Sequence, residues 1–254
     1  MVKLTELTDF LDTELSIHGV PGDKSNNGLQ VEGKAEVRKV IGGVDGSLEL
    51  YRQASEKSGD FIFVHHGESW GDSLRYLTGR IARRLTILFR NEISLYAAHL
   101  PLDAHPNLGN NARIATCLGI GNAAPFAEYA GVNVGVHGEL NCPMGAGELA
   151  AAVRSALAAD TQVFDFAGKP IRKIGIISGA GASALTECHA LGLDCLITGE
   201  CGHTEYHVIK ELADVALITA GHYKTEVPGV VAVLDLLADR FAIPCEFIDI
   251  PTEM

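Results

Sequence analysis

The segment ISLYAAHLPLD (93–103) decides the fold, because the chain contains a second version of it, ALITAGHYKTE (216–226). Both are apolar runs that end in a His, with an acid four residues further on. A longer pair also matches: IGGVDGSLELYRQASEKSGDFIFVHHG (41–67) and IGIISGAGASALTECHALGLDCLITGE (174–200) each read as strand, Gly-bearing turn, helix and strand. The repeats predict a duplicated unit, with two similar halves whose strand ends face each other across a pseudo-twofold axis. Chance similarity between apolar strands is the alternative.

Apolar runs with β-branched or aromatic centres alternate with helical stretches along the chain. Strands are expected at 37–44, 60–66, 93–99, 132–138, 172–178, 194–199, 215–221 and 246–250. Helices are expected at 3–16, 46–58, 72–91, 108–118, 146–159, 183–191, 203–212 and 228–240. This alternation predicts an α/β fold with mixed (α+β) sheets whose faces are covered by helices. The two halves are expected at 1–125 and 126–254, because the weakest junction is the stretch 119–131, which is rich in small residues.

Composition excludes several classes of protein. With 47% hydrophobic and 20% charged residues, the 254-residue chain is too apolar to be disordered. It has no apolar run of about 18–20 residues, so no transmembrane helix is expected. No signal peptide is expected either, and the six cysteines form no C-x-x-C pair, which favours reduced thiols in the cytoplasm. The net charge of −12 argues against tight nonspecific binding to nucleic acid, although a local basic patch is not excluded.

Three groups of polar residues follow predicted strands and predict a metal site. They are the HHG string at 65–67 and two His/acid pairs, His99 with Asp103 and His222 with Glu226. Imidazole and carboxylate are the usual protein ligands of zinc, iron, manganese and nickel. Because Pro101 and Pro228 interrupt or follow the pairs, a loop leading into a helix is expected at both. So many ligands favour two ions over a single tetrahedral zinc. Histidines with a purely structural role at strand ends are the alternative.

Seven strings appear in an order that resembles the NIF-three-like dinuclear metal-centre family. They are NNGLQVEG (26–33), VHHG (64–67), LYAAHLPLDAHPNLGNN (95–111), SGAG (178–181), TGE (198–200), AGHYKTE (220–226) and FIDIPT (247–252). Members of that family are often labelled GTP cyclohydrolase I type 2 homologues. The motifs run from residue 26 almost to the end of the sequence, and the length is similar to that of the short bacterial form.

The resemblance implies duplicated, intertwined α/β units that assemble into a ring-shaped homohexamer, with two divalent ions per subunit in a cleft between the halves. Carried over position by position, the implied metal ligands are His65, His66, Asp103, His222 and Glu226. Asp103 and Glu226 are the expected bridging carboxylates. His99 is expected to be either a ligand or a proton shuttle, and Glu226 and His99 are the expected catalytic residues.

Other features point to substrate contacts. We expect Glu200 and His207 on the polar rim of the cleft, and Lys224 in contact with an anionic group of the substrate. The string SGAGASA (178–184) formally fits a dinucleotide fingerprint, but a nest of backbone amides for a phosphate, or simply a turn, fits it better. Arginines at 75, 80, 83 and 84 cluster on one predicted helix, as a solvated face or as a rim that attracts a phosphorylated substrate.

These expectations define a cytoplasmic metal-dependent hydrolase in which a metal-bound hydroxide attacks a purine nucleotide such as GTP. A phosphoesterase or an amidohydrolase would use the same site, because fold resemblance does not settle substrate. Two alternatives remain: a non-catalytic, metal-binding hexameric scaffold or regulator, and a DNA-associated ring. The expected partners are copies of the chain and a small molecule, with no membrane and no nucleic acid.

Overall fold

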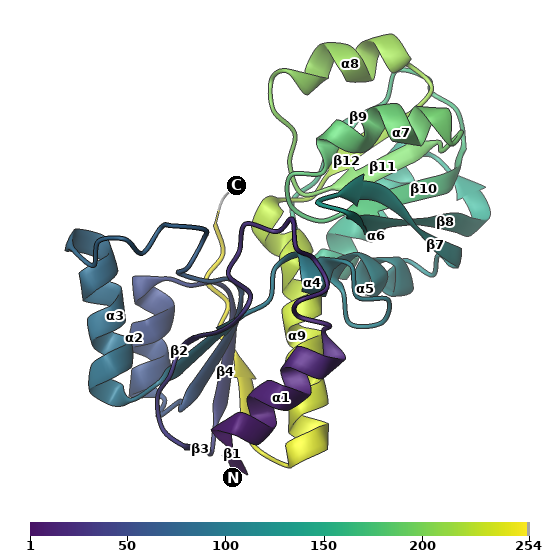
Figure 1. Cartoon of the computed structure of the whole chain (residues 1–254). Helices are drawn as coiled ribbons and strands as arrows, with labels where there is room; N and C mark the ends of the chain where they lie inside the picture. Colours follow the sequence, from purple (N-terminus) through teal and green to yellow (C-terminus); the bar gives the residue numbers. More distant parts are fainter. Residues whose placement is uncertain (253–254) are drawn as a thin grey trace. The chain divides into compact units, whose positions relative to one another are not determined.

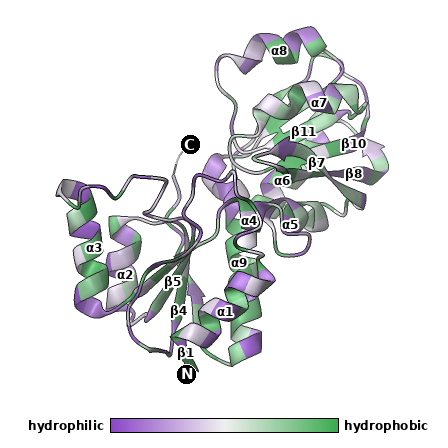
Figure 2. Cartoon of the chain, in the orientation of Figure 1, coloured by the Kyte–Doolittle hydropathy of each residue, from purple (hydrophilic) through white to green (hydrophobic). Residues whose placement is uncertain are grey.

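The computed structural model describes residues 1–252, and within that range the chain forms two compact units (Figure 1). Unit 1 comprises Met1–Leu102 and Val230–Ile250, and unit 2 comprises Asp103–Gly229 together with the tail from Pro251. Every strand and helix expected from the sequence is present, so the prediction of a mixed α/β fold is confirmed. In both units the strands are predominantly hydrophobic, whereas the helices contain both hydrophobic and hydrophilic residues (Figure 2).

Unit 1 is built on a five-stranded sheet with the order β13-β4-β5-β6-β2. Its strands are β2 (Gly28–Val31), β4 (Val40–Asp45), β5 (Phe61–His66), β6 (Ser94–Ala97) and β13 (Cys245–Phe247). All neighbours are parallel except β2, which pairs antiparallel with β6. A separate two-stranded ribbon joins β1 (Val2–Lys3) to β3 (Glu36–Val37). The helices are α1 (Leu4–Glu14), α2 (Leu48–Glu56), α3 (Gly79–Asn91) and the larger part of α9 (His222–Phe241).

Side chains of this sheet alternate between two faces, as the two-residue period of a strand requires. In β5, Ile62 and Val64 join a buried core with α2 and α3. Phe63 points to the other face and stacks on Tyr96, with ring centroids 6.0 Å apart. The Tyr96 hydroxyl donates to Asp12 of α1 at 2.7 Å. The central strands of the sheet are therefore covered on both faces.

Unit 2 is built on a six-stranded sheet with the order β7-β8-β10-β11-β12-β9. Its strands are β7 (Gly121–Tyr129), β8 (Val132–Met144), β9 (Gln162–Phe164), β10 (Ile171–Ile177), β11 (Cys195–Thr198) and β12 (Ala216–Thr219). The three central strands β10, β11 and β12 are parallel, and the others are antiparallel to their neighbours. The helices are α4 (Leu100–Asp103, which begins in unit 1), α5 (Asn110–Cys117), α6 (Ala146–Leu157), η1 (Ala182–Ala184), α7 (Leu185–Ala190) and α8 (Glu205–Leu212).

The side chains of the unit 2 sheet also alternate between its two faces. Ile174 and Ile176 of β10 and Ile197 of β11 share a core with α5 and α6. Leu196 and Leu217 are fully buried on the opposite face, which α7 and α8 cover (Figure 1). Both units thus contain three consecutive parallel strands joined by helices, which is the arrangement that the sequence repeat predicts. Because the units follow spatial packing and the predicted halves follow the repeat, the boundary near residue 125 stays a prediction.

The stretch 119–131, expected as the junction, contains edge strand β7, where Pro125 is tolerated, and a two-residue turn at Ala130 and Gly131 with positive φ at both. Two helix starts were predicted wrongly. Helix α3 begins at Gly79 and not at residue 72, because Thr78 is extended. Helix α9 begins at His222 and not at 228, so it contains Pro228.

No helix in residues 1–252 combines the length and apolarity needed to cross a membrane. All six cysteines are free thiols.

Candidate metal centre

Three histidines meet at the carboxyl ends of β5 and β6 in unit 1. His65 and His66 are consecutive in the strand, yet their rings lie together, with centroids 4.6 Å apart, because the strand ends there. His99, two residues after β6, has its ring 5.1 Å from that of His65. One nitrogen from each ring lies within 4.8 Å of the other two. The group has the spacing and the chemistry of a metal-binding face.

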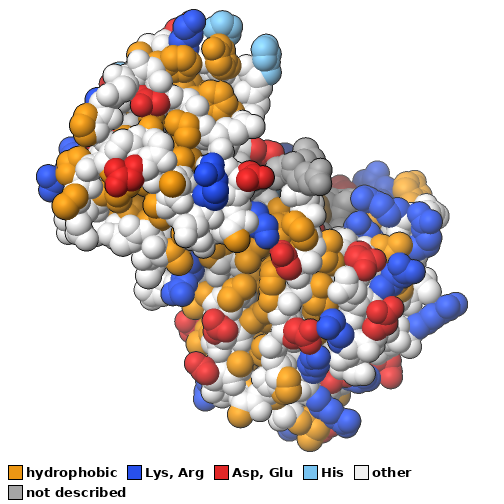
Figure 3. Space-filling model, turned by 180° about the vertical axis from the view of Figure 1, so that it is seen from behind, with side chains coloured by type: hydrophobic (Ala, Val, Ile, Leu, Met, Phe, Trp, Pro, Cys, Tyr) orange, Lys and Arg blue, Asp and Glu red, His pale blue; other side chains and the backbone are white. Residues whose placement is uncertain are grey.

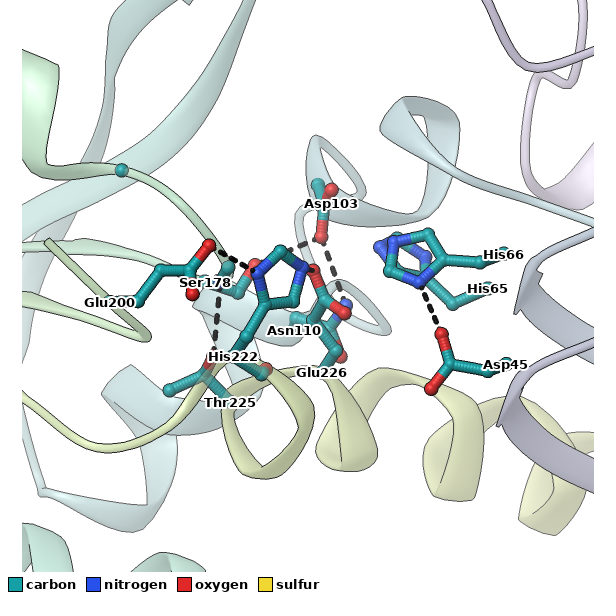
Figure 4. Close-up of polar contacts among 12 residues, drawn as sticks. Asp45, His65, His66, Asp103, Asn110, Ser178, Glu200, His222, Thr225 and Glu226 are labelled. Atoms are coloured by element: carbon teal, nitrogen blue, oxygen red, sulfur yellow. Dashed lines mark hydrogen bonds and ion pairs between the residues drawn. The ribbon is translucent and has the colours of Figure 1, made fainter. Parts of the chain in front are cut away.

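Each ring is oriented by an acceptor at Nδ1. His65 donates to the Ala98 carbonyl at 2.8 Å, His66 to Asp45 at 2.8 Å (Figure 4), and His99 to Asp23 at 2.9 Å. Since a carbonyl or carboxylate oxygen can only accept, the neutral rings carry their proton on Nδ1 and the lone pair on Nε2. Acceptors of this kind fix metal-binding histidines in proteins.

Asp23 and Asp45 are functional candidates that the sequence analysis missed. The Asp23 side chain is 2% exposed and also accepts from Asn27, whose own Oδ1 accepts from the His99 backbone N–H at 2.8 Å. Burial opposes its ionisation, but the hydrogen bonds from His99, Asn27 and the Ser25 N–H outweigh burial and lower its pKa to about 2. The string NNGLQ therefore belongs to the site, because its second Asn holds His99 in place.

Trp70 lies beside the same histidines. Its ring is 5.0 Å from His99 and 5.9 Å from His66, centroid to centroid. The indole N–H donates to the Gly67 carbonyl at 2.9 Å. Gln30 Oε1 accepts from the Glu68 backbone N–H at 2.8 Å. The backbone that follows the two histidines is therefore held by the side chains of Gln30 and Trp70.

In unit 2, His222 and Glu226 occupy the first turn of α9. They are four residues apart on one face of the helix, and His222 Nε2 is 3.1 Å from Glu226 Oε1. The expected loop at this pair is absent. Pro228 is accommodated because the next amide, Gly229 N–H, donates sideways to Asn110 Oδ1 at 2.7 Å.

Glu200, expected on the substrate rim, contacts His222 of this candidate pair directly. His222 Nδ1 lies 3.0 Å from Glu200 Oε1, so the ring sits between two carboxylates (Figure 4). Hydrogen bonding to Glu226 raises the pKa of His222 to about 9 against the opposing effect of burial, and Glu200 adds to the rise. An ion bound by His222 and Glu226 together would replace a proton on Nε2. Glu200 also lines a pocket of about 280 Å³ with Ser183, Cys201 and Glu205.

Asp103 is buried and held by two donors from unit 2. Asn110 Nδ2 and Ser178 Oγ reach the same oxygen, Oδ1, at 2.9 and 3.0 Å (Figure 4). Asn111 is fully buried as well and donates to the Asp103 carbonyl at 3.4 Å. The carboxylate is thereby fixed in one orientation, which suits a bridging ligand.

The SGAG string is not a nest for a phosphate. Ser178 N–H donates to Asn111, Gly179 N–H to Thr225 Oγ1, and Gly181 N–H to Thr198 Oγ1, so these amides are used inside the unit. Gly179 has φ +63°, and a Cβ there would lie 2.6 Å from Glu226 Oε1. The glycine therefore lets the backbone approach the ligand pair closely.

The remaining predicted substrate residues are His207 and Lys224. His207 is exposed on α8, with its ring 5.5 Å from that of Tyr206. Lys224 Nζ is 5.7 Å from the centroid of the Tyr223 ring. The substrate role of both residues stays a prediction.

The donor set fits divalent ions. It consists of imidazole nitrogens and buried carboxylates, each with an oriented hydrogen-bond partner, and it contains no thiolate. Donor sets of this kind accept several divalent metals.

This chain is similar to known proteins over nearly its whole length. A sequence model of the Duf34/NIF3 (NGG1p interacting factor 3) family matches residues 2–253. A relative from Pyrococcus abyssi, named GTP cyclohydrolase 1 type 2 homolog, is 40% identical over 248 residues, which is 97% of this chain and 98% of the relative. The solved structure of TTHA1606 from Thermus thermophilus is 36% identical with a TM-score of 0.92, and that of protein ybgI, described as of unknown function, is 34% identical with a TM-score of 0.93; each match covers 100% of both chains.

Proposed function

Because the chain belongs to the Duf34/NIF3 family, we propose that it is a metal-dependent hydrolase whose donor groups hold two divalent ions. The observation that carries the proposal is the orientation of the donors. Each candidate His has an acceptor at Nδ1, and Asp103 is fixed by two donors. An acceptor at Nδ1 leaves Nε2 of the same ring for a metal ion, which is how metal-binding histidines are oriented in proteins.

The ligands that we propose are contributed by both units: His65, His66, Asp103, His222 and Glu226. Asp103 and Glu226 are the bridging carboxylates in this proposal. Bound ions would supply a nucleophile from water near neutral pH and polarise the bond to be broken. Zinc, iron, manganese and nickel all suit these donors.

The chain's own residues would prepare and serve this chemistry. Asp45 and Asp23 hold the rings of His66 and His99 in one tautomer, and Glu200 orients the ring of His222. We propose that His99 is either a further ligand or the group that moves a proton, since Asp23 holds its ring beside those of His65 and His66. Glu226 is positioned by the first turn of α9 and by the close approach of Gly179.

The substrate and the assembly are further parts of the proposal. The curated relatives carry the name GTP cyclohydrolase 1 type 2 homolog, which suggests hydrolytic ring opening of a purine nucleotide such as GTP. Glu200, His207 and Lys224 are the proposed substrate contacts. We also propose a homohexamer that acts in the cytoplasm.

The first experiment measures metals per protomer by mass spectrometry on untagged protein purified without chelator. We expect about two ions in the parent and a clear loss in Glu226→Ala. Glu211→Ala, on the exposed side of α8, removes the same charge and should keep the parent's metal content. A parent that binds no metal, even after incubation with zinc, manganese or iron, would overturn the proposal.

Turnover is tested next, with GTP, other nucleotides and simple phosphoesters. Hydrolysis that requires the ion and is lost in Glu226→Ala at unchanged folding is the expected result. Full metal occupancy without hydrolysis of any of these compounds would reject the hydrolase while leaving the metal centre intact.

A further inference from the structure

Glu68 is a buried carboxylate that directly follows the HHG string and takes no part in the metal centre proposed above. Its side chain is 2% exposed. A charge is costly to bury unless ion pairs and hydrogen bonds compensate for the lost water. The partners of Glu68 therefore indicate what this residue does in the fold.

Two helices of unit 1 each supply a donor to the same oxygen of Glu68. Arg84 Nη1 of α3 donates to Oε1 at 2.9 Å, and the Tyr51 hydroxyl of α2 donates to it at 3.0 Å. Burial, and next the charge of Glu68, raise the pKa of Tyr51 far above its usual value, so this hydroxyl stays protonated. The carboxylate is thus tied to two helices that pack into one core.

Arg84 differs from the other arginines of its helix. Arg80, Arg83 and Arg90 are exposed, and Lys and Arg side chains gather over this part of the surface in the rear view (Figure 3). The Arg84 side chain is only 17% exposed, and within residues 1–252 Glu68 is the carboxylate that pairs with it. Helix α3 therefore turns one arginine inward, toward the residue that follows the histidines.

The backbone around Glu68 is also fixed by side chains. Gln30 Oε1 accepts from the N–H groups of Glu68 and Ser69, at 2.8 and 3.0 Å. Ser73 Oγ donates to the Glu68 carbonyl at 3.3 Å and accepts from the Trp70 N–H at 2.9 Å. Glu68 is thus the residue at which the turn 67–70 is held by its side chain and by its backbone.

These contacts reach the three-histidine face from two directions. On one side, the turn carries Trp70, whose ring lies 5.9 Å from that of His66. On the other side, the Tyr51 hydroxyl lies against Gly46, where a Cβ would be 2.5 Å from it. The Gly46 N–H donates to the His66 carbonyl at 2.7 Å. The partners of Glu68 therefore border both the backbone and the ring of this candidate ligand.

We propose that Glu68 is a positioning residue for the three-histidine face. Through its two helical partners it fixes the turn 67–70, and that turn places His66 and Trp70. An ion pair that serves stability alone is the alternative, but burying such a pair usually costs as much free energy as it returns. The effect on metal affinity rests on the proposed function, whereas the position of Trp70 does not depend on a bound ion.

The first measurement uses the full chain, freed of metal with a chelator, and hydroxyl-radical footprinting read by mass spectrometry. Glu68→Ala should raise the oxidation rates of Trp70 and His66, because the turn loses its anchor. Glu68→Gln keeps an oxygen that accepts from both donors, so its rates should lie close to those of the parent. Arg84→Ala removes one donor of the two and should raise the rates less, which keeps the test decisive if Glu68→Ala does not fold.

The second measurement is equilibrium dialysis of the same variants against nickel. Glu68→Ala should weaken nickel binding about tenfold or more, as the loss of residues that orient metal ligands does in other proteins. Glu68→Gln should restore most of the affinity. A parent chain that binds no nickel would reject the metal centre, and the oxidation rates would then decide the role of Glu68 on their own.

Asp60→Ala is the matched control, because Asp60 is also buried and paired with a cation, Lys34 Nζ at 2.8 Å. Asp60 directly precedes β5, whereas His66 ends that strand. Its loss should lower the midpoint of urea unfolding but leave the oxidation rates and the nickel affinity at parent values. If Glu68→Ala behaves in the same way, losing stability alone, the proposal is overturned.

Discussion

Asp23 illustrates how a single buried carboxylate organises the site. It accepts from His99 Nδ1 and Asn27 Nδ2, and its second oxygen also receives the Leu100 N–H at 3.1 Å. Its pKa of about 2 means that folding favours the ionised form by roughly 2 kcal/mol over an ordinary aspartate. That stabilisation is fully present above pH 4 and is lost as the pH falls toward 2, because the depressed pKa belongs to the folded state.

We therefore predict that Asp23→Asn lowers the free energy of unfolding by about 2 kcal/mol at pH 7. The difference from the parent should shrink steadily as the pH is lowered from about 4 to about 2.5. Urea unfolding at each pH measures it. Asp9→Asn, an exposed change of the same charge on α1, should have little effect. A loss that does not vary with pH would show that the charge of Asp23 is not what matters.

The sequence identified the ligand candidates but not the residues that orient them. His65, His66 and the two His/acid pairs follow apolar strands, so strand prediction alone indicated that they lie at sheet edges. Asp23 is 76 residues from His99, and a contact at that separation has no periodic signal. Glu200 was assigned to substrate, because nothing in the string TGE indicates that it faces His222.

Helix α9 carries the proposed ligands at its first turn and core residues further along. Its passage through Pro228 depends on a contact outside the helix: Gly229 N–H donates to Asn110, and the same Asn110 side chain donates to Asp103. A proline in the helix interior removes a backbone donor, and Asn110 stabilises the turn beyond it. Local sequence rules read Pro228 as a helix start, so they could not find the six preceding helical residues.

Replacing Asn110 by Ala should therefore disturb α9 and Asp103 together. We predict a loss of about 3 kcal/mol in unfolding free energy, because a buried amide and a buried carboxylate each lose a partner. Metal content should fall as well. Asn107→Ala, at an exposed position three residues earlier, is the matched control and should resemble the parent in both measurements. Normal stability in Asn110→Ala would mean that water replaces the side chain.

The sheet of unit 2 comes from one continuous stretch of the chain, whereas the sheet of unit 1 does not. All strands of the six-stranded sheet lie between residues 103 and 229, whereas unit 1 needs β13 and the end of α9 from the far end of the sequence. Val233, Leu234 and Leu237 of α9 are buried, and Leu234 packs against Gly42 of β4 so closely that a Cβ there would clash. The sequence repeat predicts two similar cores. It does not predict that residues 230–250 complete the core of unit 1, because tertiary packing decides that.

We predict that a fragment of residues 103–229 folds alone and unfolds cooperatively, whereas residues 1–102 alone do not. Without α9 and β13, unit 1 would expose one face of its sheet and an unpaired edge at β4. Thermal circular dichroism and amide proton spectra measure both. Joining 230–250 to 1–102 through a Gly/Ser linker should restore folding of unit 1. Cooperative folding of 1–102 by itself would contradict this division.

Trp70 is the only tryptophan in the sequence, and its ring lies against His66 and His99. The protein therefore has an intrinsic optical probe: its indole emission comes from one place, and that place is the three-histidine face. Paramagnetic ions such as cobalt or nickel that bind there should quench the emission in the unlabelled chain, and a chelator should restore it. Titrations of ion occupancy can thus be read from fluorescence, separately from any assay of turnover.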